Sequence, residues 1–149
     1  MGGHIKKIIL FLVTLSTMLF SQDWVYDFDE AKDLAIKDNK IIVLVFQGSD
    51  WCSPCIKLDR NIWQNNEFNK IAKENFVMLL ADFPRKKKNA LNSVQQEKNT
   101  VLAEMFNKNG FFPLVVVLDK NGDVLGRTGF KKLTPVEYAD FLLSMKNND

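Results

Sequence analysis

The chain has 149 residues, a length that fits one ordinary domain, and 46% of them are hydrophobic while 26% are charged. This balance excludes a disordered polyelectrolyte and a multi-span membrane protein, and seven glycines with four prolines exclude a collagen-like or proline-rich fibre. Two cysteines and one histidine are too few for a disulfide-stapled mini-protein or for a four-ligand structural zinc site. We therefore expect the two cysteines to act as a pair.

The N-terminal segment has the order of a secretory signal peptide. Lys6 and Lys7 precede an uncharged apolar run at 8–20, and the chain turns polar from Ser21. This run is shorter than the roughly 20 residues that span a bilayer, and a buried N-terminal helix is the alternative. We expect a signal peptide at 1–21, with its cleavage site left open, and a mature domain at 22–149. The location is then periplasmic or secreted, without stable membrane insertion after signal removal.

Removal of the signal peptide changes the charge and the available chemistry. It takes away His4 and two lysines but no acidic residue, which leaves a formally neutral mature chain. The basic balance of the whole chain therefore does not indicate nucleic-acid binding. A mature chain without histidine has no His general base, no Cys-His pair and no His metal ligand. Export also allows paired cysteines to remain oxidised.

The mature chain alternates helical patterns with apolar runs. Continuous apolar runs at 41–46, which is rich in β-branched residues, and at 76–81 and 112–118 are typical of strands that are covered on both faces. In chain order we predict a helix at 27–39, a strand at 40–46, helical segments at 52–62 and 67–74, a strand at 76–81, a helix at 90–108, strands at 112–118 and 124–126, and a helix at 134–145.

The C-terminal third carries the clearest local signals. Asn121 and Gly122 predict a hairpin turn between two antiparallel strands. Thr134, Pro135 and Glu137 supply an N-cap, a proline at the first helical position and a capping-box glutamate. Strands separated by helices imply parallel crossovers, and the hairpin adds an antiparallel edge. We therefore predict a single α/β domain around a mixed sheet of about four strands.

A basic run, Arg85, Lys86, Lys87 and Lys88, follows the second predicted strand. Consecutive cations can bind an anion, which is the alternative, but no glycine-rich cradle or interleaved aromatic residues accompany the run. We predict a solvated loop.

Cys52, Ser53, Pro54 and Cys55 follow a predicted buried strand and begin a predicted helix. Positions i and i+3 share one helix face, close enough for a disulfide once the first turn tightens. The helix N-terminus favours the thiolate of Cys52, whereas Cys55 lies one turn in and keeps its proton. We expect Cys52 to attack a substrate disulfide and Cys55 to resolve the mixed disulfide. A static structural disulfide is the alternative, but so short a loop constrains the unfolded chain little.

The segment 48–55, with Trp51 before the first cysteine and Pro54 between the two, resembles the thioredoxin superfamily, as does the later Phe112-Pro113 pair. The chain is most similar to exported bacterial thioredoxin-like proteins and to the C-terminal domain of the transmembrane thiol:disulfide interchange protein. The resemblance implies a thioredoxin-like three-layer α/β/α sandwich. It also implies that Pro113 is cis and faces the cysteines, while Phe112 offers backbone groups to an extended substrate; a trans proline at a strand start is the alternative.

The sequence also departs from the thioredoxin pattern. The family carries a buried aspartate behind the second cysteine, whereas the matching region 43–46 has no acidic residue. Asp82 is the candidate proton acceptor that remains. The stretch between Asp82 and Phe106 extends the compact family core; it either shapes substrate choice or covers the sheet.

We therefore expect an exported thiol-disulfide oxidoreductase, in the reducing direction by resemblance, with catalytic Cys52 and Cys55 as its redox-active disulfide and no cofactor or metal. The predicted substrate-binding residues are Trp51, Pro54, Phe112 and Pro113. Protein dithiols or disulfides are the expected substrates, a membrane-embedded electron donor the expected partner, and a monomer the expected state. The alternative is a non-catalytic thioredoxin-like binding module or a Cu(I) carrier that uses the same two thiols.

Overall fold

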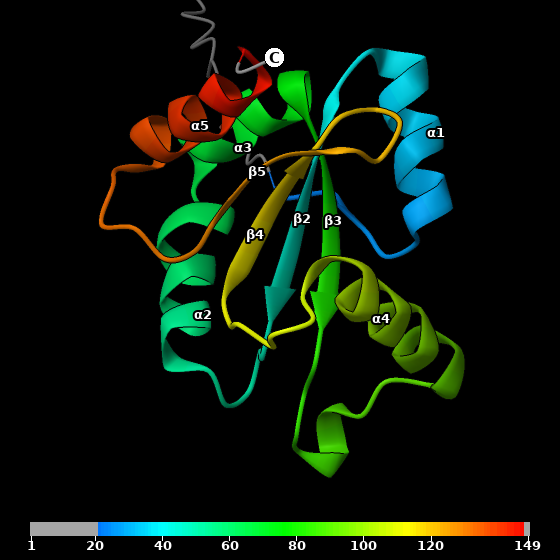
Figure 1. Cartoon of the computed structure of the whole chain (residues 1–149). Helices are drawn as coiled ribbons and strands as arrows, with labels where there is room; N and C mark the ends of the chain where they lie inside the picture. The colour runs from blue at the N-terminus through cyan, green and yellow to red at the C-terminus, as the bar shows by residue number, and fades with distance from the viewer. Residues whose placement is uncertain (1–20, 148–149) are drawn as a thin grey trace, which may run out of the picture.

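A computed structural model describes residues 21–147, so the predicted signal peptide, apart from Ser21, lies outside the described residues. Five strands form one mixed sheet in the order β1-β3-β2-β4-β5 (Figure 1). The strands are β1 (Trp24–Val25), β2 (Ile41–Gln47), β3 (Phe76–Asp82), β4 (Leu114–Leu118) and β5 (Val124–Thr128).

Strand β2 lies at the centre of the sheet because its residues are apolar on both faces. It pairs in parallel with β3, from Ile41 opposite Phe76 to Gln47 opposite Asp82. On its other side it pairs antiparallel with β4. Every residue from 41 to 46 is buried, which is the pattern that the continuous apolar run predicted.

Helices cover both faces of the sheet, so the predicted three-layer α/β/α architecture is confirmed (Figure 1). Helices α1 and α4 pack on one face, and α2, α3 and α5 on the other. Their bounds are α1 (Phe28–Asp38), α2 (Ser53–Leu58) with the π-helical turn η1 (Asp59–Trp63), α3 (Asn66–Asn75), α4 (Ser93–Phe106) and α5 (Pro135–Ser144), with short 3-10 turns η2 (Lys87–Asn89) and η3 (Met145–Asn147).

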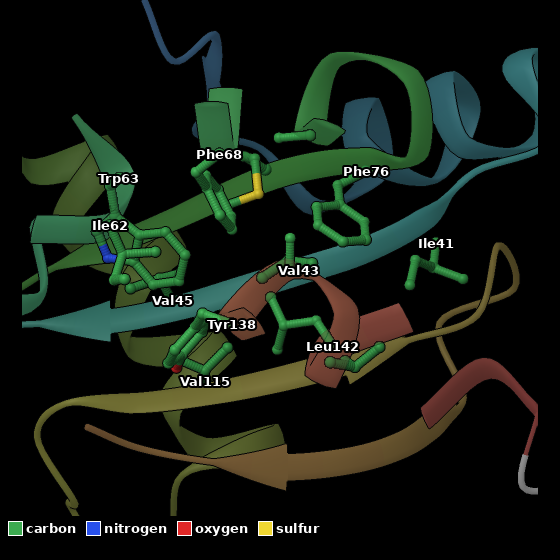
Figure 2. Close-up of a cluster of buried hydrophobic side chains, with 14 of the residues drawn as sticks. Ile41, Val43, Val45, Ile62, Trp63, Phe68, Phe76, Val115, Tyr138 and Leu142 are labelled. Carbon is green, nitrogen blue, oxygen red and sulfur yellow. The ribbon is translucent and has the colours of Figure 1, made fainter. Parts of the chain in front are cut away.

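Each face of the sheet has its own hydrophobic core. The core under α2, α3 and α5 contains an aromatic group, which we call the core aromatic cluster: Trp63, Phe68 and Tyr138 (Figure 2). The ring of Trp63 meets those of Phe68 and Tyr138 at centroid distances of 5.1 and 5.5 Å. The opposite core, under α1 and α4, is built from aliphatic residues and two phenylalanines, Phe46 and Phe106.

Local signals fixed most element ends. Thr134 and Glu137 form the predicted capping box, with both reciprocal hydrogen bonds present. The helix predicted at 90–108 is shorter than expected: the side chain of Asn92 accepts a hydrogen bond from the Gln95 backbone N–H and starts α4 at Ser93. The short strand β1 was not predicted, because two residues show no alternation.

Two further observations concern the helices and the loops of the described residues. Within residues 21–147, no helix is both long and apolar enough to cross a bilayer. The loops that follow β2 and β3, and the loop that precedes β4, all lie at one end of the sheet (Figure 1). This end carries the cysteine pair and the basic run.

Candidate redox site

The two cysteines form a disulfide at the start of helix α2. Their Cα atoms are 5.2 Å apart, and Cys52 is the N-cap residue of the helix. The backbone N–H of Cys55 donates a hydrogen bond to the Sγ of Cys52, with an N···S distance of 3.3 Å. Cys52 is 5% exposed and Cys55 is 1% exposed. The pair is therefore almost buried, and Cys52 is slightly more exposed than Cys55.

The turn before Cys52 is built around Gly48. The carbonyl of Gly48 accepts the backbone N–H of Cys52 at 2.9 Å. A Cβ atom added to Gly48 would lie 2.2 Å from the indole ring of Trp51, so only glycine leaves room for this ring. The indole N–H donates to the Phe83 carbonyl at 2.7 Å, which holds Trp51 against the loop that follows β3.

Trp51 belongs to a second group of rings, which we call the site aromatic cluster: Trp51, Phe83 and Phe112. The Phe112 ring lies 5.3 Å from Trp51 and 5.5 Å from Phe83, both in edge-to-face contacts. The sequence had proposed Trp51 and Phe112 as substrate-binding residues, and the structure brings them into contact. All three residues are half-buried, so each keeps a part that is accessible to solvent.

The peptide bond between Phe112 and Pro113 is cis, as the family resemblance implied. Pro113 lies directly before β4, and its carbonyl would be 3.2 Å from a Cβ added to Gly129. The hydroxyl of Tyr138 donates to the Gly129 carbonyl at 2.9 Å. Burial raises the pKa of Tyr138 above its ordinary value, so this hydroxyl stays a donor. The core is thus linked to the loop that packs beside Pro113.

The acidic residue proposed for deprotonating Cys55 has other partners. The two carboxylate oxygens of Asp82 accept hydrogen bonds from the backbone N–H and the hydroxyl of Ser49, at 2.9 and 2.6 Å.

Two other residues next to the cysteine turn differ in burial. Phe46, the last apolar residue of β2, is fully buried and stacks on Phe83. Pro54 is exposed within the first turn of α2, as a proline at this position allows.

Asp50 anchors the basic loop, which the sequence did not predict. We define the basic loop as residues 85–88. The carboxylate of Asp50 accepts hydrogen bonds from the backbone N–H groups of Arg85 and Lys86 at 2.9 and 3.0 Å, and from the Asn89 amide at 2.9 Å. These bonds, the Arg85 N–H first, lower the pKa of Asp50 from 3.8 to about 2.

The side chain of Arg85 completes the link between the basic loop and the site. Its guanidinium lies over the Trp51 ring, 3.6 Å from the ring centroid, in a cation–π contact. Asp50 and Arg85 are 35 positions apart in the sequence, so no local sequence pattern predicts the hydrogen bond between them. The sequence shows only that a run of four cations follows the second predicted strand. Parallel pairing of that strand with the one before Cys52 places both loops at the same end of the sheet.

A mixed sheet between two helical layers, with a Cys-x-x-Cys disulfide at the start of a helix, defines the thioredoxin-like class of proteins. A family model described as thioredoxin-like matches residues 23–120, and the chain belongs to that family. Two curated proteins of known name are similar to this chain. Over 102 residues the chain is 39% identical to the disulfide bond reductase DsbH of Chlamydia pneumoniae, covering 68% of this chain and 60% of that protein. It is 26% identical over 127 residues to the thioredoxin-related protein DsbJ of the same organism, covering 85% of this chain and 36% of that protein.

A solved structure gives the same result. The structure titled DsbH oxidoreductase superposes with a TM-score of 0.78 and 33% identity, and the match covers 87% of each chain. The predicted membership of the thioredoxin superfamily is therefore confirmed. The chain spans less than two thirds of the length of the two curated relatives, 60% of one and 36% of the other.

Proposed function

We propose that this protein is an exported thiol-disulfide oxidoreductase that reduces disulfides in client proteins through Cys52 and Cys55. The hydrogen bond from the Cys55 N–H to the Cys52 Sγ carries the proposal. In the reduced protein this donor stabilises a thiolate on Cys52 and leaves Cys55 without an equivalent partner. The relative DsbH is named a disulfide bond reductase, which supports the reducing direction.

The reaction consists of two thiol–disulfide exchanges. The Cys52 thiolate attacks one sulfur of the client disulfide; a Cys52–client disulfide forms, and the second client sulfur leaves as a thiolate that takes up a proton. Cys55 then loses its proton and attacks the Cys52 sulfur, which re-forms the intramolecular disulfide and releases the first client sulfur. Two electrons pass to the client, and an external dithiol donor must restore the reduced pair.

Several finer features belong to the same proposal. Cys52 is the nucleophile and Cys55 the resolving thiol, while Trp51, Pro54, Phe112 and Pro113 contact the client segment. The donor that recharges an exported reductase is a membrane-embedded protein, and the signal-peptide pattern at 1–21 supports a periplasmic or secreted location. Contact with the client is by strand-like pairing beside the cis Phe112–Pro113 bond.

A trapping experiment tests the roles of the two cysteines. Each reduced variant is incubated with a disulfide-bonded peptide, and adducts are measured by mass spectrometry. We expect Cys55→Ser to accumulate a mixed disulfide through Cys52, because resolution is blocked, and Cys52→Ser to form none. Ser53→Ala lies in the same turn and keeps both thiols, so it should turn over normally and accumulate no adduct. Equal trapping by both cysteine variants would refute the assignment.

The reaction itself is tested with insulin and dithiothreitol. We expect the wild-type protein to accelerate the precipitation of reduced insulin chains, and Cys52→Ser to leave only the uncatalysed rate. Stoichiometric Cu(I) uptake by the reduced protein with no acceleration would refute catalysis and indicate a carrier. A pair that cannot be reduced in glutathione buffers would indicate a structural disulfide.

A further inference from the structure

The basic loop lies against the residue that directly precedes the reactive cysteine. Arg85 rests on the ring of Trp51, and the Asp50 carboxylate holds the backbone at Arg85 and Lys86. The loop is therefore fixed relative to Cys52, although 33 positions separate Cys52 from Arg85 in the sequence. Because Trp51 directly precedes Cys52, a client sulfur bonded to Cys52 lies near the residue on which Arg85 rests.

The cations of the basic loop are accessible to solvent, including Arg85, one side of which rests on Trp51. All four side chains are exposed, and within residues 21–147 none of them forms an ion pair with a carboxylate. The carboxylates of Asp50 and Asp82 accept hydrogen bonds from backbone and side-chain donors of the turns at this end of the sheet. The loop therefore presents four consecutive positive charges in a predicted mature chain whose basic and acidic residues are in balance only when these four are counted.

We propose that the basic loop is a docking surface for an acidic segment of the client polypeptide, next to the client cysteine. This inference rests on the proposed function. Four consecutive residues reach at most about 14 Å when extended, so acidic side chains within a few positions of the client cysteine can reach the loop. Opposite charges at the rim of an interface raise the association rate and select among partners. The loop thereby favours clients with Asp or Glu beside the reactive disulfide.

The test compares three disulfide-bonded peptides that differ only in the three residues flanking the cysteine: all Glu, all Gln or all Lys. The measured quantity is the ratio of kcat/KM for the Glu peptide to kcat/KM for the Lys peptide. We expect the wild-type ratio to be about tenfold or more at low salt, and to decline towards one as the ionic strength rises above about 0.5 M. The Gln peptide reports the basal reaction without the charge effect.

Two matched triple variants locate the effect. The first reverses three cations of the loop, Lys86→Glu, Lys87→Glu and Lys88→Glu, and leaves Arg85 on Trp51. The second changes the net charge equally at three exposed lysines outside the basic loop, each to Glu: Lys37 near the end of α1, Lys120 in the turn between β4 and β5, and Lys146 in η3. We expect the first variant to reverse the preference and to keep its rate with the Gln peptide. The control variant should retain most of the wild-type ratio.

Each outcome separates this inference from the proposed function. No turnover of any peptide by the wild-type protein would overturn both. Turnover of all three at one rate, or the same loss of preference in both triple variants, would overturn only the docking surface. Cosedimentation with vesicles containing about one third phosphatidylserine is measured in parallel. Vesicle binding that depends on Lys86–Lys88, together with an unchanged peptide ratio, would show that the loop contacts lipid instead and would overturn the proposal.

Discussion

The molecule contains two groups of edge-to-face aromatic rings with similar spacing and different surroundings. In the core aromatic cluster, ring centroids are 5.1 and 5.5 Å apart, and Trp63, Phe68 and Tyr138 are almost completely buried. In the site aromatic cluster, the centroids are 5.3 and 5.5 Å apart, but Trp51, Phe83 and Phe112 are half-buried.

The difference lies in what holds each group in place. The core cluster is surrounded by apolar side chains from α3, α5 and the sheet, so its position follows from close packing (Figure 2). The site cluster is only half-buried, and specific contacts hold Trp51 in place. Its indole N–H donates a hydrogen bond to the Phe83 carbonyl, the Arg85 guanidinium lies over its ring, and the absence of a Cβ at Gly48 leaves room for the ring. Ring geometry alone therefore does not tell whether a cluster stabilises a fold or positions a reactive group.

The largest loss of stability should come from truncating a ring of the core aromatic cluster. Trp63→Ala removes a ring that is 1% exposed and leaves a cavity, which should cost about 3–5 kcal/mol in the free energy of unfolding. Urea titration measures this loss, and insulin reduction below the unfolding transition should stay near the wild-type rate. A variant as stable as the wild type, or one that is folded but inactive, would break the separation between the two clusters.

Gly48→Ala should act on the site cluster. The added methyl group would overlap the Trp51 indole, so the ring must move; we expect a cost of about 1–3 kcal/mol. Misplacing Trp51 beside Cys52 should also lower kcat/KM for insulin by roughly 10- to 100-fold. In a Trp51→Leu background the same substitution has no indole to displace and should have little further effect. A full effect in both backgrounds would show that Gly48 acts through something other than Trp51.

The smallest effect concerns the Asp50 anchor and its dependence on pH. Folding lowers the pKa of Asp50 from 3.8 to about 2, so the anchor contributes fully above about pH 4 and is lost as pH falls through 2. The amides of Arg85 and Lys86 should stay protected from hydrogen exchange between pH 6 and pH 3.

Asp50→Asn is the matched control for this measurement. Its side-chain amide keeps one accepting oxygen and replaces the other by a donor, so at least one of the two amides should lose its protection even at pH 6. Loss of protection in the wild-type protein between pH 5 and pH 3.5 would contradict the lowered pKa and the anchor.

The sequence predicted much of this protein because its signals are local. Apolar runs predicted β2, β3 and β4, the Thr134 capping box predicted α5, and the i, i+3 spacing predicted that Cys52 and Cys55 can bond. The resemblance to thioredoxins, carried by residues around these cysteines and by Phe112-Pro113, implied the cis bond that the structure shows.

Other features were decided only by the tertiary structure. Asp50 bonds to residues 35 to 39 positions later, and Trp51 bonds to the carbonyl of Phe83, 32 positions away. Such contacts depend on which loops the parallel pairing of β2 with β3 brings to one end of the sheet. Periodicity reports which face of an element is apolar, but it carries no information about which polar groups meet after the sheet has formed. The basic loop could therefore be read from the sequence as a run of charges, whereas its contact with Trp51, the residue before Cys52, could not.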